Sequence, residues 1–135
     1  MKPALHTTHH RAGLTLVEVM IGLALVALMA AIAIPGYQRA RKRAQASRTL
    51  EELRILDYAV DQYGLETGKK AGENVTFTDV KAYVKNNTLV YATGKDCFYQ
   101  AYGPFIIDDS PKVPAFTYAE LLDVAPPEFW IPYNP

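Results

Sequence analysis

The chain opens with a sharp division between polar and apolar positions. The first 13 residues are largely polar, and the 21 residues from Leu14 to Ile34 are apolar or small apart from Thr15 and Glu18. Coiled as a helix, such a run is about 30 Å long, the thickness of the hydrocarbon core of a bilayer. From Tyr37 onward charged residues become frequent. The pattern therefore predicts that the chain enters or crosses a membrane once, near its N-terminus.

Beyond Pro35 the apolar positions follow a helical period. They recur every three or four residues, which is typical of an amphipathic helix, and Gly64 and Gly68 mark its expected end. The positions are Tyr37, Ala40, Ala44, Ser47, Leu50, Leu53, Leu56, Val60 and Tyr63. If Pro35 only kinks the chain, residues 14–63 form one rod of about 75 Å. A local break at 34–36 is equally compatible with the sequence, because proline disfavours helical geometry in the residue before it.

The last 72 residues, 64–135, predict a small globular head that contains two short helices. Thr78 is the expected cap of a helix that runs to Lys85, since threonine hydroxyls satisfy free N–H groups at helix starts. Thr117 and Glu120 have the spacing of a capping box and predict a second helix, which ends before Pro126. The proline-rich C-terminal tail is expected to lie extended across the head, with its aromatic side chains as anchors.

Short apolar runs in the head predict strands. The expected strands are residues 89–91, 98–102 and 105–107, of which the last two pair across Gly103-Pro104. We thus predict an α+β chain, in which a long N-terminal helix carries a small head with a short antiparallel sheet. Residues 14–34 form the membrane-embedded half of the helix, and residues 64–135 form the head.

Composition narrows the chemistry that the chain can perform. Its 14 Lys and Arg residues balance 14 Asp and Glu residues, so no basic excess is present to hold a nucleic acid. Cys97 is the only cysteine, which excludes an intrachain disulfide and a cysteine-rich zinc site. The three histidines all lie in the first ten residues, and without that stretch no histidine base or metal ligand is left. We therefore expect a protein that is not an enzyme and that holds neither a metal nor a cofactor.

Three interpretations of the N-terminus compete. A secretory signal has a shorter apolar region, although Ala31-Ile32-Ala33 fits the cleavage pattern of such signals. A plain membrane anchor leaves Glu18 unexplained. The third interpretation rests on Arg11-Ala12-Gly13 followed by Leu14-Thr15-Leu16-Val17-Glu18, which resembles the leader and cleavage site of type IV prepilins and type II secretion pseudopilins. Pro35 and Tyr37 also stand where that family usually has a proline and a tyrosine, so the resemblance covers residues 11 to about 40.

The resemblance implies how the chain is processed and where it acts. A prepilin peptidase removes residues 1–13 by cutting after Gly13 and methylates the new amine on Leu14, where the family usually has phenylalanine. The product is a pilin-like, single-pass protein of the bacterial inner membrane with its head in the periplasm. It forms a homo-oligomeric filament with other pilins or pseudopilins on an inner-membrane platform. A separate ATPase drives assembly, since the chain contains no phosphate-binding loop.

Glu18 is the candidate assembly residue. A carboxylate inside a membrane segment is costly and therefore indicates a function with a specific partner. By the resemblance, that partner is the Leu14 amine of a neighbouring subunit, because a misplaced subunit would leave both charges unpaired in lipid. The alternative is a carboxylate close enough to the interface to reach water.

Charge is distributed unevenly along the processed chain. Five basic residues and no acidic one lie between residues 39 and 48, namely Arg39, Arg41, Lys42, Arg43 and Arg48. From Asp96 onward six acidic residues oppose only Lys112. Asp108 and Asp109 could therefore contact the basic stem of the next subunit in a filament. Alternatively, the stem binds the anionic headgroups of membrane lipid.

Several alternatives stay open at the level of sequence. The basic residues after the apolar run outnumber those before it, and the positive-inside rule alone would place the head in the cytoplasm, against the family. The stretch Asp108-Asp109-Ser110 is too poor in oxygen ligands for a calcium site. The filament is either a type II secretion pseudopilus or a type IV pilus. The competing function is a membrane-anchored or secreted small binding module of unknown ligand.

Overall fold

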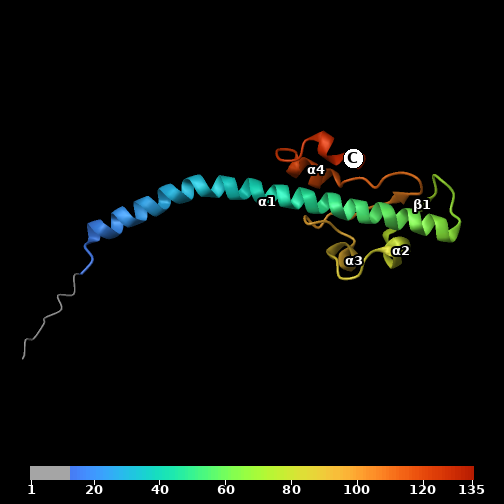
Figure 1. Ribbon diagram of the computed structural model, residues 1–135, viewed down its shortest axis with the longest axis horizontal. Coiled ribbons are helices and arrows are strands. Elements are labelled where there is room, and N and C mark those ends of the chain that lie inside the picture. Colours follow the sequence, from blue (N-terminus) through green and yellow to red (C-terminus); the bar gives the residue numbers. More distant parts are fainter. Residues whose placement is uncertain (1–12) are drawn as a thin grey trace, which may run out of the picture. The chain divides into compact units, whose positions relative to one another are not determined.

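The computed structural model of the protein describes residues 13–135 (Figure 1). In chain order the elements are α1 (Leu16–Thr67), β1 (Asn74–Val75), α2 (Phe77–Val80), the 3-10 helix η1 (Lys81–Tyr83), α3 (Leu89–Thr93), β2 (Phe105–Ile106), α4 (Ala115–Leu121) and the 3-10 helix η2 (Pro127–Trp130). The chain divides into two compact units, Met1–Tyr37 and Gln38–Pro135. The expected α+β class is confirmed, with a long N-terminal helix, a small head and one two-stranded antiparallel sheet.

Helix α1 is longer than the sequence indicated. It continues without interruption through Pro35, so the break considered at 34–36 does not occur. It also passes Gly64, where a Cβ would lie 3.2 Å from Ile107, and the glycine thereby lets the chain after β2 approach the helix closely. Gly68 ends the helix, because its φ of +68° is in the left-handed region that glycine adopts without strain.

The first unit presents its apolar side chains outward. Every large apolar side chain from Leu14 to Ile34 is exposed. By length and composition, α1 is able to cross a membrane, a test that a signal sequence also meets. This half of α1 therefore needs an apolar surrounding that the described chain itself does not supply.

The second unit forms its core on one face of α1. The predicted face is correct at Leu53 and Leu56, which are fully buried. It is wrong at Ser47, which is exposed, while Ala46 and Thr49 are buried in its place. Small residues here let the head approach the helix, and the Thr49 hydroxyl lies 3.7 Å from the sulfur of Cys97.

The sheet pairs strands that the sequence did not pair. Strand β2 lies within the expected run 105–107, but its partner is β1, with Asn74 opposite Ile106 and Val75 opposite Phe105. Residues 98–102 form no named strand: Ala101 makes only an isolated antiparallel bridge with Lys95, and a buried side chain binds other backbone groups of the segment. The Asp96 carboxylate accepts hydrogen bonds of 2.8 Å from the backbone N–H groups of Phe98 and Gln100.

Helix caps decide the other differences from prediction. Residues 89–91 form part of α3 and not a strand, because the Thr88 hydroxyl caps the helix at the Tyr91 N–H and Gly94 ends it at a φ of +64°. The helix expected from Thr78 begins earlier, as α2, where the Asp79 carboxylate accepts from the N–H and hydroxyl of Thr76.

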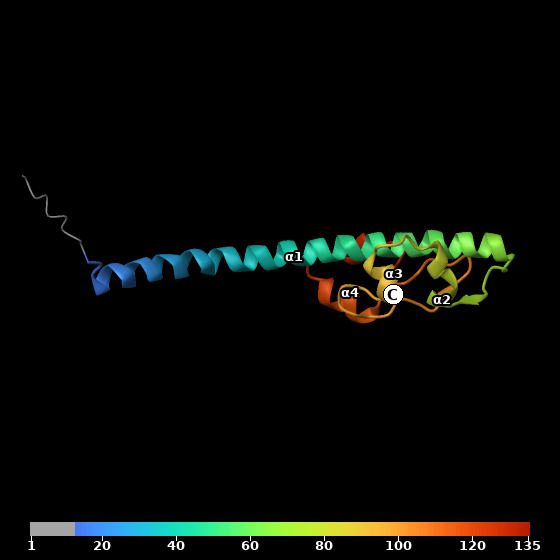
Figure 2. The same ribbon diagram turned by 90° about the horizontal axis from the view of Figure 1, so that it is seen from below.

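Helix α4 and the C-terminal tail pack against the second half of α1 (Figures 1 and 2). Thr117 is no cap, because α4 already begins at Ala115 and buries Thr117 within it. The tail is not fully extended either, since residues 127–130 form η2. Its aromatic anchors are confirmed at Trp130 and Tyr133, which are buried.

Candidate functional site

Gly13 and Leu14 lie in an exposed stretch just before α1. Within residues 13–135 nothing lies within 4 Å of the position that a Cβ on Gly13 would take. Its φ also lies outside the left-handed region. The described fold therefore does not need a glycine at position 13. If the protein requires Gly13, the requirement comes from a partner that binds this exposed stretch.

Glu18 caps the helix that contains it. Its Oε2 atom accepts hydrogen bonds of 2.8 Å from both the backbone N–H and the hydroxyl of Thr15, and the Glu18 N–H donates to the Thr15 hydroxyl at 3.2 Å. This is a capping box, which satisfies backbone N–H groups at the start of a helix. The sequence carries the signal for this cap, a threonine followed three residues later by a glutamate, in addition to the assembly role expected of Glu18. The other oxygen, Oε1, accepts no hydrogen bond from the described residues.

The basic stem, Arg39, Arg41, Lys42 and Arg43, lies at the start of the second unit. The Lys42 ammonium donates to the Asp123 carboxylate at 3.1 Å and to the Glu120 carbonyl at 3.0 Å. These contacts tie α1 to the end of α4. None of the three arginines forms an ion pair within the described part of the chain.

Asp108 and Asp109 lie in the turn after β2, away from the basic stem in sequence. With Asp57 and Asp61 of α1 they line a hollow of about 180 Å³. Burial raises the pKa of the Asp57 carboxyl, an effect that a hydrogen bond from the Tyr133 hydroxyl opposes and the nearby charge of Asp61 reinforces. The described residues contain no group of three or more carboxylate, histidine or cysteine side chains placed to hold a metal ion. The sequence did not indicate that α1 contributes two acids here.

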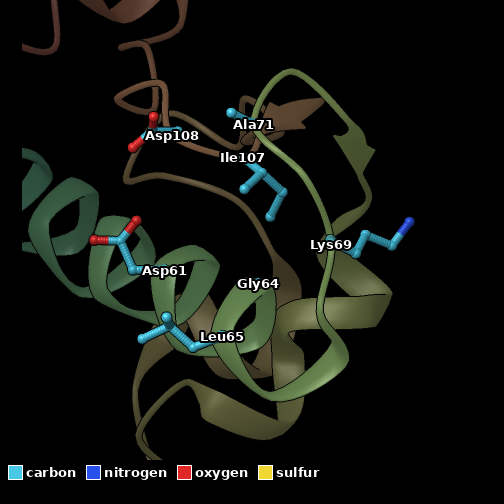
Figure 3. A pocket seen from close by; sticks show the side chains of 7 residues that line it. All are labelled: Asp61, Gly64, Leu65, Lys69, Ala71, Ile107 and Asp108. Carbon is cyan, nitrogen blue, oxygen red and sulfur yellow. The ribbon is translucent and has the colours of Figure 1, made fainter.

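A second hollow, of about 430 Å³, lies beside the C-terminal end of α1 (Figure 3). Asp61 and Leu65 of α1 face Ile107 and Asp108 across it, and Lys69 lies on the loop that follows the helix. Leu65 is 85% exposed. The lining combines the apolar side chains of Leu65 and Ile107 with two acids and Lys69, and it contains no histidine, cysteine or serine. It is a surface hollow without the groups of an active site.

Two buried carboxylates hold the second unit together. The Asp96 carboxylate accepts from the Thr117 hydroxyl in addition to its two backbone donors. The Glu52 carboxylate accepts from the Tyr102 hydroxyl at 2.9 Å and from Arg48 at 3.0 Å, and burial together with this carboxylate raises the pKa of the Tyr102 hydroxyl. The Tyr102 and Thr117 hydroxyls lie 50 and 21 residues along the chain from the carboxylates that they bind, so no local pattern in the sequence could have revealed these two contacts.

Comparison with known proteins agrees with the N-terminal geometry. The profile of the prokaryotic N-terminal methylation motif matches residues 8–34, which include Gly13, Leu14 and Glu18. The type IV major fimbrial protein FimA of Dichelobacter nodosus is 44% identical over 61 residues, which cover 45% of this chain and 38% of FimA. The type IV major pilin protein PilE1 of Neisseria gonorrhoeae is 37% identical over 92 residues, which cover 60% of this chain and 56% of PilE1. The chain is therefore similar to type IV pilins.

Other type IV pilin relatives show the same extent of similarity. A fimbrial protein of Pseudomonas aeruginosa is 36% identical over 85 residues, 62% of this chain and 54% of that protein. The chain thus spans between about two fifths and just over half the length of these curated pilin relatives. No solved structure matches it significantly. The methylation motif, which matches residues 8–34, therefore locates part of this similarity at the start of the N-terminal helix.

Proposed function

We propose that the chain is a structural subunit of a type IV pilus and not an enzyme. The observation that carries this proposal is the combination, within the matched residues 8–34, of an unconstrained Gly13, an exposed apolar helix and a single carboxylate near its start. The names of the relatives, fimbrial protein and major pilin, support a pilus over other filaments.

Processing and membrane insertion follow from this role. A prepilin peptidase removes residues 1–13 and methylates Leu14, and residues 14–34 then hold the subunit in the inner membrane with the head, 64–135, in the periplasm. A separate ATPase acts on an assembly platform to build the filament from the helical segment 14–63, with Pro35 as the place where the helix bends. The five basic residues after the apolar run oppose this orientation. An alkaline phosphatase fusion to the C-terminus tests it, since an inactive fusion would place the head in the cytoplasm.

Glu18 selects the register of the filament by pairing with the Leu14 amine of a neighbouring subunit. Its Oε2 atom is occupied by Thr15, whereas a carboxylate offers about four acceptor positions in total. Oε1 is therefore able to accept from an amine while the helix cap stays in place. Removing the amine's partner leaves a charge in an apolar surrounding, which is the costly state that directs assembly.

Charged residues outside the membrane strengthen contacts between subunits. The acidic turn of Asp108 and Asp109 meets arginines of the basic stem on the next subunit. Exposed pairs contribute about 0–1 kcal/mol each and are screened over about 10 Å at 0.1 M salt. Reversing Arg41 and Arg43 to Glu should weaken filaments most at low salt, and lysines at positions 108 and 109 should restore them. Filaments of unchanged stability at low and high salt would remove this contact from the proposal.

Two other functions remain as alternatives, and an observation favours the first of them. The single cysteine favours a type II secretion pseudopilin, because many pilus-forming pilins close a C-terminal loop with a disulfide that this chain is unable to form. Genes for a secretin and a secretion ATPase beside this one would support that choice, and a retraction ATPase would support the pilus. A membrane-anchored or secreted binding module is the third candidate.

Mass spectrometry of the mature N-terminus tests the proposal. The expected N-terminus is methylated Leu14, whereas a start at Ile34 indicates secretion and an intact Met1 indicates a plain anchor. Gly13→Leu should block cleavage and leave full-length precursor in the membrane. Gly22→Leu is the matched control, because a Cβ at Gly22 also meets nothing within 4 Å among the described residues, yet this glycine lies outside the cleavage motif. Normal maturation of Gly13→Leu would refute the assignment.

A further inference from the structure

We propose that, before assembly, the head rests on the headgroups of an anionic phospholipid bilayer through an aromatic face that lies beside the basic stem. The aromatic face consists of Phe98, Tyr99 and Phe116. This inference goes beyond the proposed function and uses only one part of it, the insertion of residues 14–34 in a membrane.

Contacts within the second unit join the aromatic face to the stem. Phe98 lines a hollow of about 380 Å³ together with Arg41 and Lys42 of α1. The rings of Phe98 and Phe116 pack edge to face, with their centroids 6.1 Å apart and their planes at 74°. The Lys42 ammonium reaches the Glu120 carbonyl in α4, the helix that carries Phe116. The aromatic rings therefore lie at the same end of the head as Arg41 and Lys42.

Two of the aromatic side chains are exposed, Phe116 on α4 and Tyr99 on a loop that is held in place. Tyr99 is 75% exposed and Phe116 is 51% exposed, which is unusual for large aromatic groups in a small domain. Tyr99 has a φ of +62°, a left-handed conformation that is uncommon outside glycine. Around it the buried Asp96 carboxylate binds the N–H groups of Phe98 and Gln100, so the loop is fixed with the tyrosine pointing to its surroundings. The loop therefore holds Tyr99 in an exposed position that is preorganised for binding.

Charge identifies the partner as anionic. The Lys42 charge is compensated by Asp123. The three arginines of the stem are left without an ion pair in the described residues, and guanidinium groups match the geometry of phosphate oxygens. Anionic lipid headgroups attract basic residues next to a membrane segment, and tyrosine side chains such as Tyr99 favour the same interfacial layer. Arg41 beside the aromatic face thus fits a bilayer surface.

Chain length brings this surface within reach of the bilayer. Arg41 lies seven positions after Ile34, the last residue of the apolar run, which corresponds to about 10 Å of helix. The headgroup layer on each side of the hydrocarbon core is about 5–7 Å thick. Because membrane helices tilt by about 20° on average, a face beside the stem meets that layer when the helix tilts toward it.

The test measures how deeply the aromatic face lies in lipid. The full-length chain, with Cys97→Ser, receives one nitroxide label at Tyr99→Cys, at Phe116→Cys or, as the control, at Tyr58→Cys, which is 76% exposed in the wild type and farther along α1. Each is reconstituted in vesicles of phosphatidylcholine with phosphatidylglycerol, and in phosphatidylcholine alone. Accessibility to a water-soluble nickel chelate is then compared by electron paramagnetic resonance.

We expect the labels at 99 and 116 to be at least threefold less accessible than the label at 58 in the anionic vesicles. Arg41→Gln with Arg43→Gln should abolish most of this protection, whereas Lys85→Gln, which removes an exposed charge elsewhere, should not. Equal accessibility at all three positions would overturn the proposal. Protection that persists without anionic lipid and rises with protein density would also overturn it, and would assign the face to a second copy. A precursor that fails to mature would refute the pilin function but leave this measurement intact.

Discussion

Replacing Thr117 by valine should destabilise the head by about 1–3 kcal/mol, the cost of leaving a buried acceptor without its donor. The Asp96 carboxylate is 1% exposed and Thr117 is fully buried. Valine has nearly the shape of threonine, so the substitution creates no cavity and removes only the hydroxyl that donates to Asp96. The whole effect is therefore assigned to this hydrogen bond.

Replacing Asp96, the partner of Thr117, should lower the stability of the head further. Asp96→Ala removes the acceptor of two backbone N–H groups and of the Thr117 hydroxyl, and three lost partners at about 1 kcal/mol each give about 3 kcal/mol or more. In the Asp96→Ala background, Thr117→Val should add little, because the contact is already lost. The resulting coupling energy of the double-mutant cycle should be about 1 kcal/mol or more.

The fluorescence of Trp130 provides the assay. It is the only tryptophan of the chain and is fully buried, with its indole N–H bonded to the Ala125 carbonyl, so its emission reports unfolding of the head. Urea titrations of the full chain in detergent give the free energy of unfolding. Thr78→Val, at an exposed threonine, is the control and should change it by less than about 0.5 kcal/mol. A Thr117→Val variant as stable as this control would refute the importance of the Asp96 bond.

Three further substitutions test other parts of the molecule. Glu18→Val should be cleaved normally but form few filaments, and assembly at the normal rate would mean that the carboxylate simply reaches water. Asp57→Asn should raise the melting temperature at pH 7, and the gain in the free energy of unfolding should be less than about 1 kcal/mol. The reason is that the raised pKa of Asp57 makes the wild type lose stability as the pH rises through it, and melting curves below about pH 4 should show no difference. Gly94→Ala should destabilise the head by about 1–2 kcal/mol or more in urea titrations, because alanine disfavours a φ of +64° and its Cβ would lie 2.8 Å from the ring of Phe77.

The sequence predicted secondary structure best where apolar residues recur over many helical turns. The apolar run from Leu14 and the period that includes Leu53 and Leu56 extend over enough residues to indicate a helix without knowledge of its surroundings. Short runs carry no such information. Residues 89–91 are apolar in either a strand or a buried helix, and the hydroxyl of Thr88 with the left-handed Gly94 decides between them.

The head was harder to predict because its structure depends on distant partners. Residues 98–102 are apolar and aromatic like a strand, but the Asp96 side chain binds their backbone, and its second oxygen is bound by Thr117 from α4. Of the candidate site, the order of Gly13, Leu14 and Glu18 along the chain was readable at once. The spacing of Thr15 and Glu18 also carries the signal of a capping box, and the structure shows the hydrogen bonds that form it.

The exposed half of α1 also limits the route by which a subunit can travel. Thirteen large apolar side chains between Leu14 and Ile34 are exposed in the isolated chain. At about 1.5–3 kcal/mol for each, exposing all of these side chains to water would cost about 20–40 kcal/mol. The free energy of unfolding of a whole domain is typically only about 5–15 kcal/mol. Under the proposed function, a dissolved pool of such subunits is therefore excluded. In that assembly the apolar half of α1 has to pass from lipid to neighbouring helices without exposure to water.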